Sequence, residues 1–289
     1  PTSGYSQRSI SVDKIGLDVV YLNYLPSALA LGTAYWLYQR VVQNDKRMSH
    51  GLFGATLLLV LASIHAIIHT VADDGTGESF ITRGIISLSF ALIGLVLLRT
   101  LPRYAYLSDM TIWAKGLLLV TLLRYTFYDL LQYNPLFNSS QSVGDIPLLN
   151  GITLTYGPAL LLTLVAARHR FGVETMGISP MLYKMLGLIF LFALVSLHVR
   201  QIFHGTNLTQ GAMENAELYT YSIVWLLSGI GLLAYGMKRN DAPLRLAALC
   251  FLTLTIGKVF LIDASELEGL YRIFSFLGLG VSLIGLSMY

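Results

Sequence analysis

The feature that most constrains this chain is a series of long apolar runs, each about as long as a bilayer crossing. The run 51–71, for example, contains two histidines but no acidic residue, lysine or arginine. A helix needs about 20 residues to span the hydrocarbon core, so runs of this length indicate membrane spans. The apolar positions are continuous rather than alternating, which favours helices over strands. Because 55% of the residues are hydrophobic and 12% are charged, we predict an all-α polytopic transmembrane protein.

Hydropathy predicts nine transmembrane helices in this chain. They lie at roughly 17–39, 51–71, 80–98, 107–131, 148–167, 181–204, 216–236, 243–263 and 270–289. The chain begins at Pro1 with neither a methionine nor a cleavable signal pattern, so we expect a processed or partial chain.

The segments between the predicted spans alternate in charge. The basic segments hold Arg40, Lys46, Arg47, Arg99, Arg103, Arg168, Arg170, Lys238, Arg239 and Arg245. The acidic segments hold Asp73, Asp74, Glu78, Asp145, Glu214, Glu217, Glu266 and Glu268. Because lysine and arginine in short loops mark the cytoplasmic face, we predict a multi-pass membrane protein with its N-terminus outside and its C-terminus cytoplasmic.

Similar residues recur in the same order along the two halves of the chain, which predicts an internal duplication. The matching pairs are Ser63 and Ser196, His65 and His198, Glu78 and Glu217, Arg124 and Lys258, and Asp129 and Asp263, at separations of 133 to 139 positions. Each copy would hold four helices, an even number, so both copies would enter the membrane from the same side as parallel repeats. We therefore predict repeats at 51–170 and 180–289, preceded by a segment 1–50 with one extra helix.

Ionisable residues inside the predicted spans gather in the outer half of the membrane. They are His65, His69, Glu78, Arg83, Arg124 and Asp129 in the first copy, and His198, Arg200, His204, Glu217, Lys258, Asp263 and Arg272 in the second. Such residues are costly in lipid and usually face protein or a wet cavity. We therefore expect an outward-facing polar cavity. In it, Lys258, Arg200 and Arg272 would hold an anionic group while His198, Glu217 and Asp263 orient them or relay protons.

Each of these residues also has a structural interpretation. Arg83, Arg200 and Arg272 could instead anchor their helices at the membrane interface. Arg124 and Lys258 could instead form buried pairs that fix the register between helices. On a regular helix Lys258 and Asp263 would lie about 140° apart, so we expect no direct contact between them. Glu217, Glu266 or Glu268 would then be the partner of Lys258.

The histidines suggest two chemical roles. His198 with Glu217 has the residue types of an acid–base pair. His65 and His69 have the spacing of metal ligands, but no third ligand follows, so we expect neither a metal nor another cofactor.

The run from Leu194 to Tyr289 resembles a bacterial family of multi-span membrane proteins catalogued as domain of unknown function 2339. The resemblance rests on the segments 197–205, 216–222, 258–263 and 270–280, which read LHVRQIFHG, AELYTYS, KVFLID and LYRIFSFLGLG. It is strong over this last third and weak over the first copy, where Arg124 stands for Lys258 and Asn150 lies near the place of Arg272. The resemblance implies a membrane fold and a bacterial inner-membrane location, and it implies no activity.

Three functions fit these observations. The leading hypothesis is a protein that binds or transports an envelope-related solute, lipid headgroup or glycan in the polar cavity, with His65, Arg124 and Asp129 as the first copy's ligand residues. The second is an integral-membrane transferase or hydrolase for a lipid-linked envelope substrate, with His198 or Glu217 as general base. The third is a non-catalytic scaffold of an envelope complex. Expected partners are membrane lipids, a lipid-linked or anionic envelope ligand and membrane subunits, and not nucleic acid.

Overall fold

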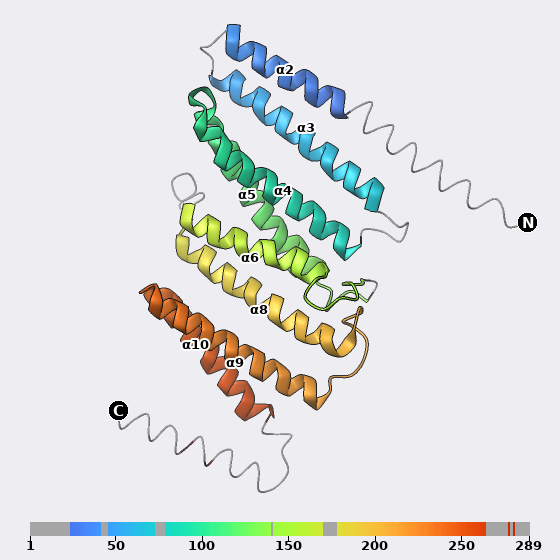
Figure 1. The fold of residues 1–289 in the computed structure, drawn as a ribbon, viewed down its shortest axis with the longest axis vertical. Helices are drawn as coiled ribbons and strands as arrows, with labels where there is room; N and C mark the ends of the chain where they lie inside the picture. The colour runs from blue at the N-terminus through green and yellow to red at the C-terminus, as the bar shows by residue number, and fades with distance from the viewer. Residues whose placement is uncertain are drawn as a thin grey trace, which may run out of the picture.

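A computed structural model describes residues 24–41, 46–72, 79–139, 141–169 and 178–263, together with Leu277 and Gly280. In chain order the elements are α2 (Leu25–Val41), α3 (Lys46–Ala72), α4 (Phe80–Thr100), η2 (Leu101–Arg103), η3 (Ala105–Met110), α5 (Thr111–Leu123), η4 (Arg124–Gln132), α6 (Gly151–His169), α8 (Pro180–His204), α9 (Asn215–Lys238) and α10 (Ala242–Leu261). Over these described ranges the regular structure is entirely helical. The long helices lie side by side, and their order in space broadly follows the chain (Figure 1).

Seven helical stretches within the described ranges are long and apolar enough to cross a membrane. The predicted all-α polytopic fold is therefore confirmed. The count of nine spans stays a prediction, because the expected span 270–289 lies outside the described residues except for Leu277 and Gly280. The expected first span overlaps α2, which has 17 described residues.

The chain runs back and forth, so the helix ends form two sides. We call the side with Val41, Lys46, Thr100, Thr111, His169, Pro180, Lys238 and Ala242 the basic side, and the opposite side the acidic side. Several of these ends are capped by side chains that satisfy free backbone N–H groups. Ser79 accepts a hydrogen bond from the Thr82 amide at the start of α4, and Asp241 accepts one from the Leu244 amide at the start of α10.

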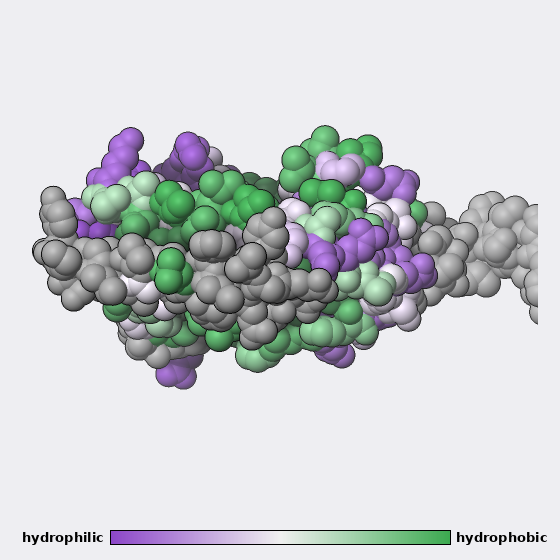
Figure 2. Space-filling view, turned by 90° about the horizontal axis from the view of Figure 1, so that it is seen from below, coloured by the Kyte–Doolittle hydropathy of each residue, from purple (hydrophilic) through white to green (hydrophobic). Residues whose placement is uncertain are grey.

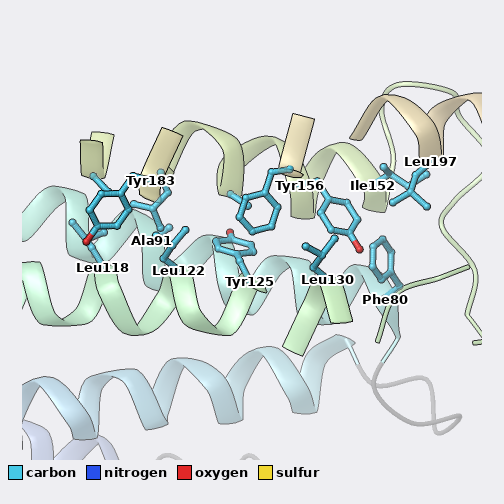
Figure 3. Close-up of a cluster of buried hydrophobic side chains, with 14 of the residues drawn as sticks. Phe80, Ala91, Leu118, Leu122, Tyr125, Leu130, Ile152, Tyr156, Tyr183 and Leu197 are labelled. Atoms are coloured by element: carbon cyan, nitrogen blue, oxygen red, sulfur yellow. The ribbon is translucent and has the colours of Figure 1, made fainter. Parts of the chain in front are cut away.

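The buried core lies between α4, α5, η4, α6 and α8. Tyr125 and Tyr156 lie near its middle, with Tyr183 toward one end and Phe80 toward the other (Figure 3). Glycines let these helices approach closely, as membrane helices require. A Cβ on Gly94, for instance, would lie 2.5 Å from a Leu118 methyl carbon.

Much of the remaining surface is apolar. Figure 2 shows hydrophobic side chains through the middle of the described surface, with hydrophilic groups toward its two ends. Exposed leucine, isoleucine and valine side chains occur on every long helix, including Leu58, Leu161 and Leu254. Helices that are apolar on most faces fit a hydrocarbon environment, where lipid covers the faces that do not pack on protein.

Candidate functional site

The first cluster of polar residues connects α4 with η4. Arg124 donates from Nε to the Ser87 hydroxyl at 2.9 Å, and that hydroxyl donates to Oδ2 of Asp129 at 2.8 Å. The η4 segment is a π-helix, in which hydrogen bonds run from residue i to i+5. Residues five apart are therefore about one turn apart, so Arg124 and Asp129 both reach the same serine.

The second cluster also combines a cation, a serine and an aspartate, and it joins α9 to α10. Lys258 donates from Nζ to Oδ1 of Asp263 at 2.8 Å, to the Ser222 hydroxyl at 2.6 Å and to the Leu218 carbonyl at 2.7 Å. Ser222 also donates to Oδ2 of Asp263. These three acceptors take all three hydrogens of the ammonium group.

The expectation that Lys258 and Asp263 do not touch is thus wrong. It assumed one regular helix through both residues, but α10 ends at Leu261 and the chain turns at Ile262 (φ −106°, ψ −59°). Asp263 therefore lies outside the helical register and folds back to the ammonium group. Neither Glu217 nor another residue on α9 supplies the carboxylate that was expected for Lys258, and Glu266 and Glu268 lie outside the described residues.

A third cluster holds the start of α9 against the end of α8. Arg200 contacts both carboxylate oxygens of Glu217 from Nη1 at 3.0 Å, and Nε2 of His204 lies 2.8 Å from Oε2. Arg200 also donates from Nε to the carbonyl of Leu208 in the following loop. The Glu217 side chain is fully buried, and its carboxylate is satisfied by the Arg200 guanidinium and the His204 ring.

His198 is placed apart from Glu217. Its Nδ1 donates to the Leu194 carbonyl at 2.7 Å, and its Nε2 lies 3.0 Å from the Thr153 hydroxyl on α6. The proposed pairing of His198 with Glu217 is therefore not what the structure forms, because His204 occupies that position. His198 holds α8 to α6, and sequence spacing alone did not separate the two histidines because both lie on the acidic-side half of the helix.

The other expected site residues are dispersed. His65 and His69 lie one turn apart on α3, with ring centroids 6.2 Å apart and planes tilted by 45°, and Arg272 lies outside the described residues. Over the described ranges, three or more histidine, cysteine, aspartate or glutamate residues nowhere come together as metal ligands. One anion was expected to bind Lys258, Arg200 and Arg272 together. Lys258 and Arg200 are instead paired with the carboxylates of Asp263 and Glu217.

Sequence reasoning missed an apolar groove between α3, α4 and α5. Its volume is about 1040 Å³, and its lining includes His50, Leu61, His65, Phe90, Gly116 and Leu117. Leu58, Ile112 and Val120, which also line it, are 64%, 53% and 59% exposed, so the groove opens to the surface. From His50 to Ala66 it follows α3 for about 24 Å, at 1.5 Å per residue.

The basic-side end of the groove is built by Trp113. Its indole Nε1 donates to Nδ1 of His50 at 3.3 Å, and its ring fills the space beside Gly54, where a Cβ would lie 2.4 Å from it. Gly116 lies on the groove, and a Cβ added there would meet no atom within 4 Å. A glycine within an apolar span was the one available sequence signal, but close helix packing gives the same signal.

Comparison with known proteins bears on the whole chain. A family model described as "Predicted membrane protein (DUF2339)" matches residues 7–288. No curated protein and no solved structure matches. The match extends the resemblance seen in the last third of the sequence to both halves.

Proposed function

The chain belongs to the DUF2339 family of predicted membrane proteins, and we propose that it binds an anionic phospholipid of the bacterial inner membrane, with one acyl chain in the α3–α5 groove. The observation that carries this proposal is the groove itself, which is long, apolar and open to the side of the helix layer. A phospholipid is also the first partner such a groove meets in a bilayer.

The dimensions of the groove support an acyl chain as its occupant. It extends for about 24 Å, most of the roughly 30 Å hydrocarbon core. Its walls are leucine, alanine, isoleucine and aromatic side chains that offer a chain close contact but few hydrogen bonds. Interactions of this kind favour an alkyl chain over a glycan or another polar solute, since buried polar groups require partners.

The charge near one end supports an anionic headgroup. Arg47 lies in the first turn of α3, on the basic side and close to His50, and Lys115 directly precedes Gly116 on α5. The neighbouring Lys46 is already paired with Asp109 at 2.7 Å, so it is not counted among these cations. Lysine and arginine near the membrane surface attract anionic lipids by about 1 kcal/mol each. We therefore place the headgroup on the basic side.

In this proposal the charged clusters stabilise the helix packing and do not bind the lipid. Arg124, Arg200 and Lys258 each contact an acceptor on a neighbouring helix or its adjoining loop. Their geometry favours holding helices together over taking up a mobile anion, and it favours neither His198 nor Glu217 as a general base.

Native mass spectrometry tests the proposal directly. The protein, stripped of lipid in detergent, is incubated with mixed micelles of phosphatidylglycerol and phosphatidylethanolamine. We expect one tightly retained lipid with a preference for phosphatidylglycerol. Gly116→Leu would place a branched side chain in the groove and displace several methylene groups. At about 0.8 kcal/mol per buried methylene, retention should fall about tenfold or more.

Gly231→Leu is the matched control. Gly231 is an exposed α9 glycine, distant in sequence from the groove, and a Cβ there also meets no atom within 4 Å. Gly231→Leu changes helix propensity and surface hydrophobicity in the same way as Gly116→Leu, but it leaves the groove open. Equal lipid retention in Gly116→Leu, Gly231→Leu and the unmodified protein would reject the groove as the binding site, and no retained lipid in any of them would reject lipid binding.

A further inference from the structure

The two cation–serine–aspartate clusters occupy corresponding positions in the two halves of the chain. Ser87 and Ser222 are 135 positions apart, and the cation and aspartate of each cluster are 134 apart. The serine comes from α4 or α9, and the cation comes from η4, which continues α5, or from α10. Ser87 could not be selected from the sequence beforehand, so its position is an independent match.

A threonine pair repeats at the same spacing. Thr121 and Thr255, again 134 positions apart, are both buried and both donate to the carbonyl four residues earlier, at 2.8 and 2.9 Å. Those carbonyls belong to Leu117 and Phe251, which are therefore also equivalent. The stretches from Leu117 to Arg124 and from Phe251 to Lys258 thus correspond residue by residue over about two turns.

The correspondence extends to two residues that line the groove, Phe90 and Leu117. Three aromatic side chains meet in the second half, one from each of α8, α9 and α10. Phe192 lies 4.8 Å from Trp225 and 5.8 Å from Phe251 between ring centroids. At spacings of 133 to 135, the first half has Leu59, Phe90 and Leu117 in their places. Every one of the three is smaller. Phe90 and Leu117 line the groove, and Leu59 lies on α3 next to the lining residue Leu58.

A hydrogen bond shows the consequence of one replacement. Trp225 donates from Nε1 to the Ser196 hydroxyl at 3.0 Å, which joins α9 to α8. Phe90 has no such donor, and Ser63, the equivalent of Ser196, donates instead to the Leu59 carbonyl of its own helix. The first half therefore lacks both the aromatic filling and the bond that closes α8 onto α9 in the second half.

We propose that the two halves are copies of one helical unit, and that the groove in the first copy is a specialised acyl-chain site produced by replacing the aromatic residues Phe192, Trp225 and Phe251 of the second copy with Leu59, Phe90 and Leu117. The assignment of an acyl chain rests on the proposed function. The identity of the residues that open or fill the site does not depend on which lipid binds.

Reciprocal exchange of these residues tests the inference. The filled variant carries Leu59→Phe, Phe90→Trp and Leu117→Phe, and the opened variant carries Phe192→Leu, Trp225→Phe and Phe251→Leu. With phosphatidylglycerol as the probe, native mass spectrometry should show that the filled variant loses the bound lipid. The opened variant should gain a second lipid with a similar chain-length preference.

The outcomes separate this inference from the proposed function. If the unmodified protein retains no lipid, the proposed function fails. If it retains one that Gly116→Leu displaces, but the filled variant keeps its lipid, the specialisation of these three positions is wrong. If the filled variant loses its lipid while a folded opened variant gains none, the equivalence of the two copies is wrong. Should the opened triple variant not fold, Phe251→Leu alone replaces it, and the same second lipid is expected.

Discussion

At the scale of single residues, two ion clusters reach the same arrangement through different backbones. Arg124 and Asp129 share Ser87 because the chain between them is π-helical, whereas Asp263 reaches Lys258 because α10 has already ended. In both, a serine on the neighbouring helix bridges cation and carboxylate. A charge in a membrane interior is costly unless it is paired, so each cluster makes its two helices depend on one another.

Removing one charge of the second cluster should therefore destabilise the protein more than removing both. Lys258→Met leaves the Asp263 carboxylate without its cation, and side-chain exposure is only 11% for Lys258 and 6% for Asp263. Breaking a buried pair in this way costs about 3–5 kcal/mol. In Lys258→Met/Asp263→Leu no charge is left unpaired, so part of the stability should return. Thermal unfolding in detergent measures both variants, and a double variant less stable than the single one would contradict this account.

Several of the charged residues selected from the sequence do form clusters, but their contacts within the clusters were not predicted correctly. The i, i+5 spacing of cation and aspartate was visible in both halves, but a regular helix was assumed between them. The bridging serines were missed because serine is common in membrane helices and costs little there. Pairing of His198 with Glu217 failed for a related reason, since a position along a helix says little about the direction in which a side chain points.

At the scale of helices, the sequence predicted where the helices lie along the chain better than it predicted which of their faces pack together. The long apolar runs became helices close to their expected positions because the thickness of the bilayer sets their length. These helices are apolar on nearly every face, so the pattern does not distinguish the face that packs on protein from the face that meets lipid. For α6, with Ile152, Tyr156 and Ala159 fully buried, that choice defines the core. The groove beside α3 exists because the side chains there are too small to fill the space between the helices, and a hydropathy pattern does not report side-chain size.

The ion pair between Lys184 on α8 and Asp241 at the start of α10 should make the protein less stable at acidic pH. Lys184 on α8 donates to Asp241, and this hydrogen bond lowers the pKa of Asp241 below its ordinary value. A carboxylate whose pKa is lowered by folding stabilises the protein above its unfolded pKa of about 3.9, and the contribution is lost as the pH falls through the folded pKa.

Asp241→Asn isolates this effect, because asparagine retains an oxygen that caps α10 but carries no charge. Both side chains are partly exposed, so the loss at neutral pH should be about 1 kcal/mol or less. The unfolding temperature of the two proteins should converge as the pH is lowered from about 5 to below the folded pKa. A constant difference across this range, measured in one detergent and salt concentration, would show that the ion pair does not contribute.

At the scale of the whole molecule, the core and the groove lie in different places. The large buried cluster joins α4, α5, α6 and α8, whereas the groove lies on the opposite flank of α5, toward α3. Substitutions such as Gly116→Leu should therefore change ligand binding without removing core contacts. The polar clusters lie toward the acidic side, and the basic residues near His50 lie at the other end. An anionic lipid in the groove would place its headgroup on the basic side.

The side of the membrane that this headgroup faces follows from the loop charges. Because basic loops stay in the cytoplasm, the basic side should be cytoplasmic and the acidic side should be external. Tyr106, in η3 on the basic side, and Met213, in the loop before α9 on the acidic side, are 63% and 55% exposed, so both positions accept a cysteine label. Cys250 is the single cysteine, and Cys250→Ala provides an unlabelled background.

In cells whose outer membrane has been opened, a membrane-impermeant maleimide should label Met213→Cys at once and Tyr106→Cys only after the inner membrane is lysed. The physical reason is that translocating a loop rich in lysine and arginine is disfavoured, whereas acidic residues have little influence on orientation. The reverse labelling pattern would put the basic side outside. The groove would then present its cationic end to the outer leaflet, and the lipid it selects would have to come from that leaflet.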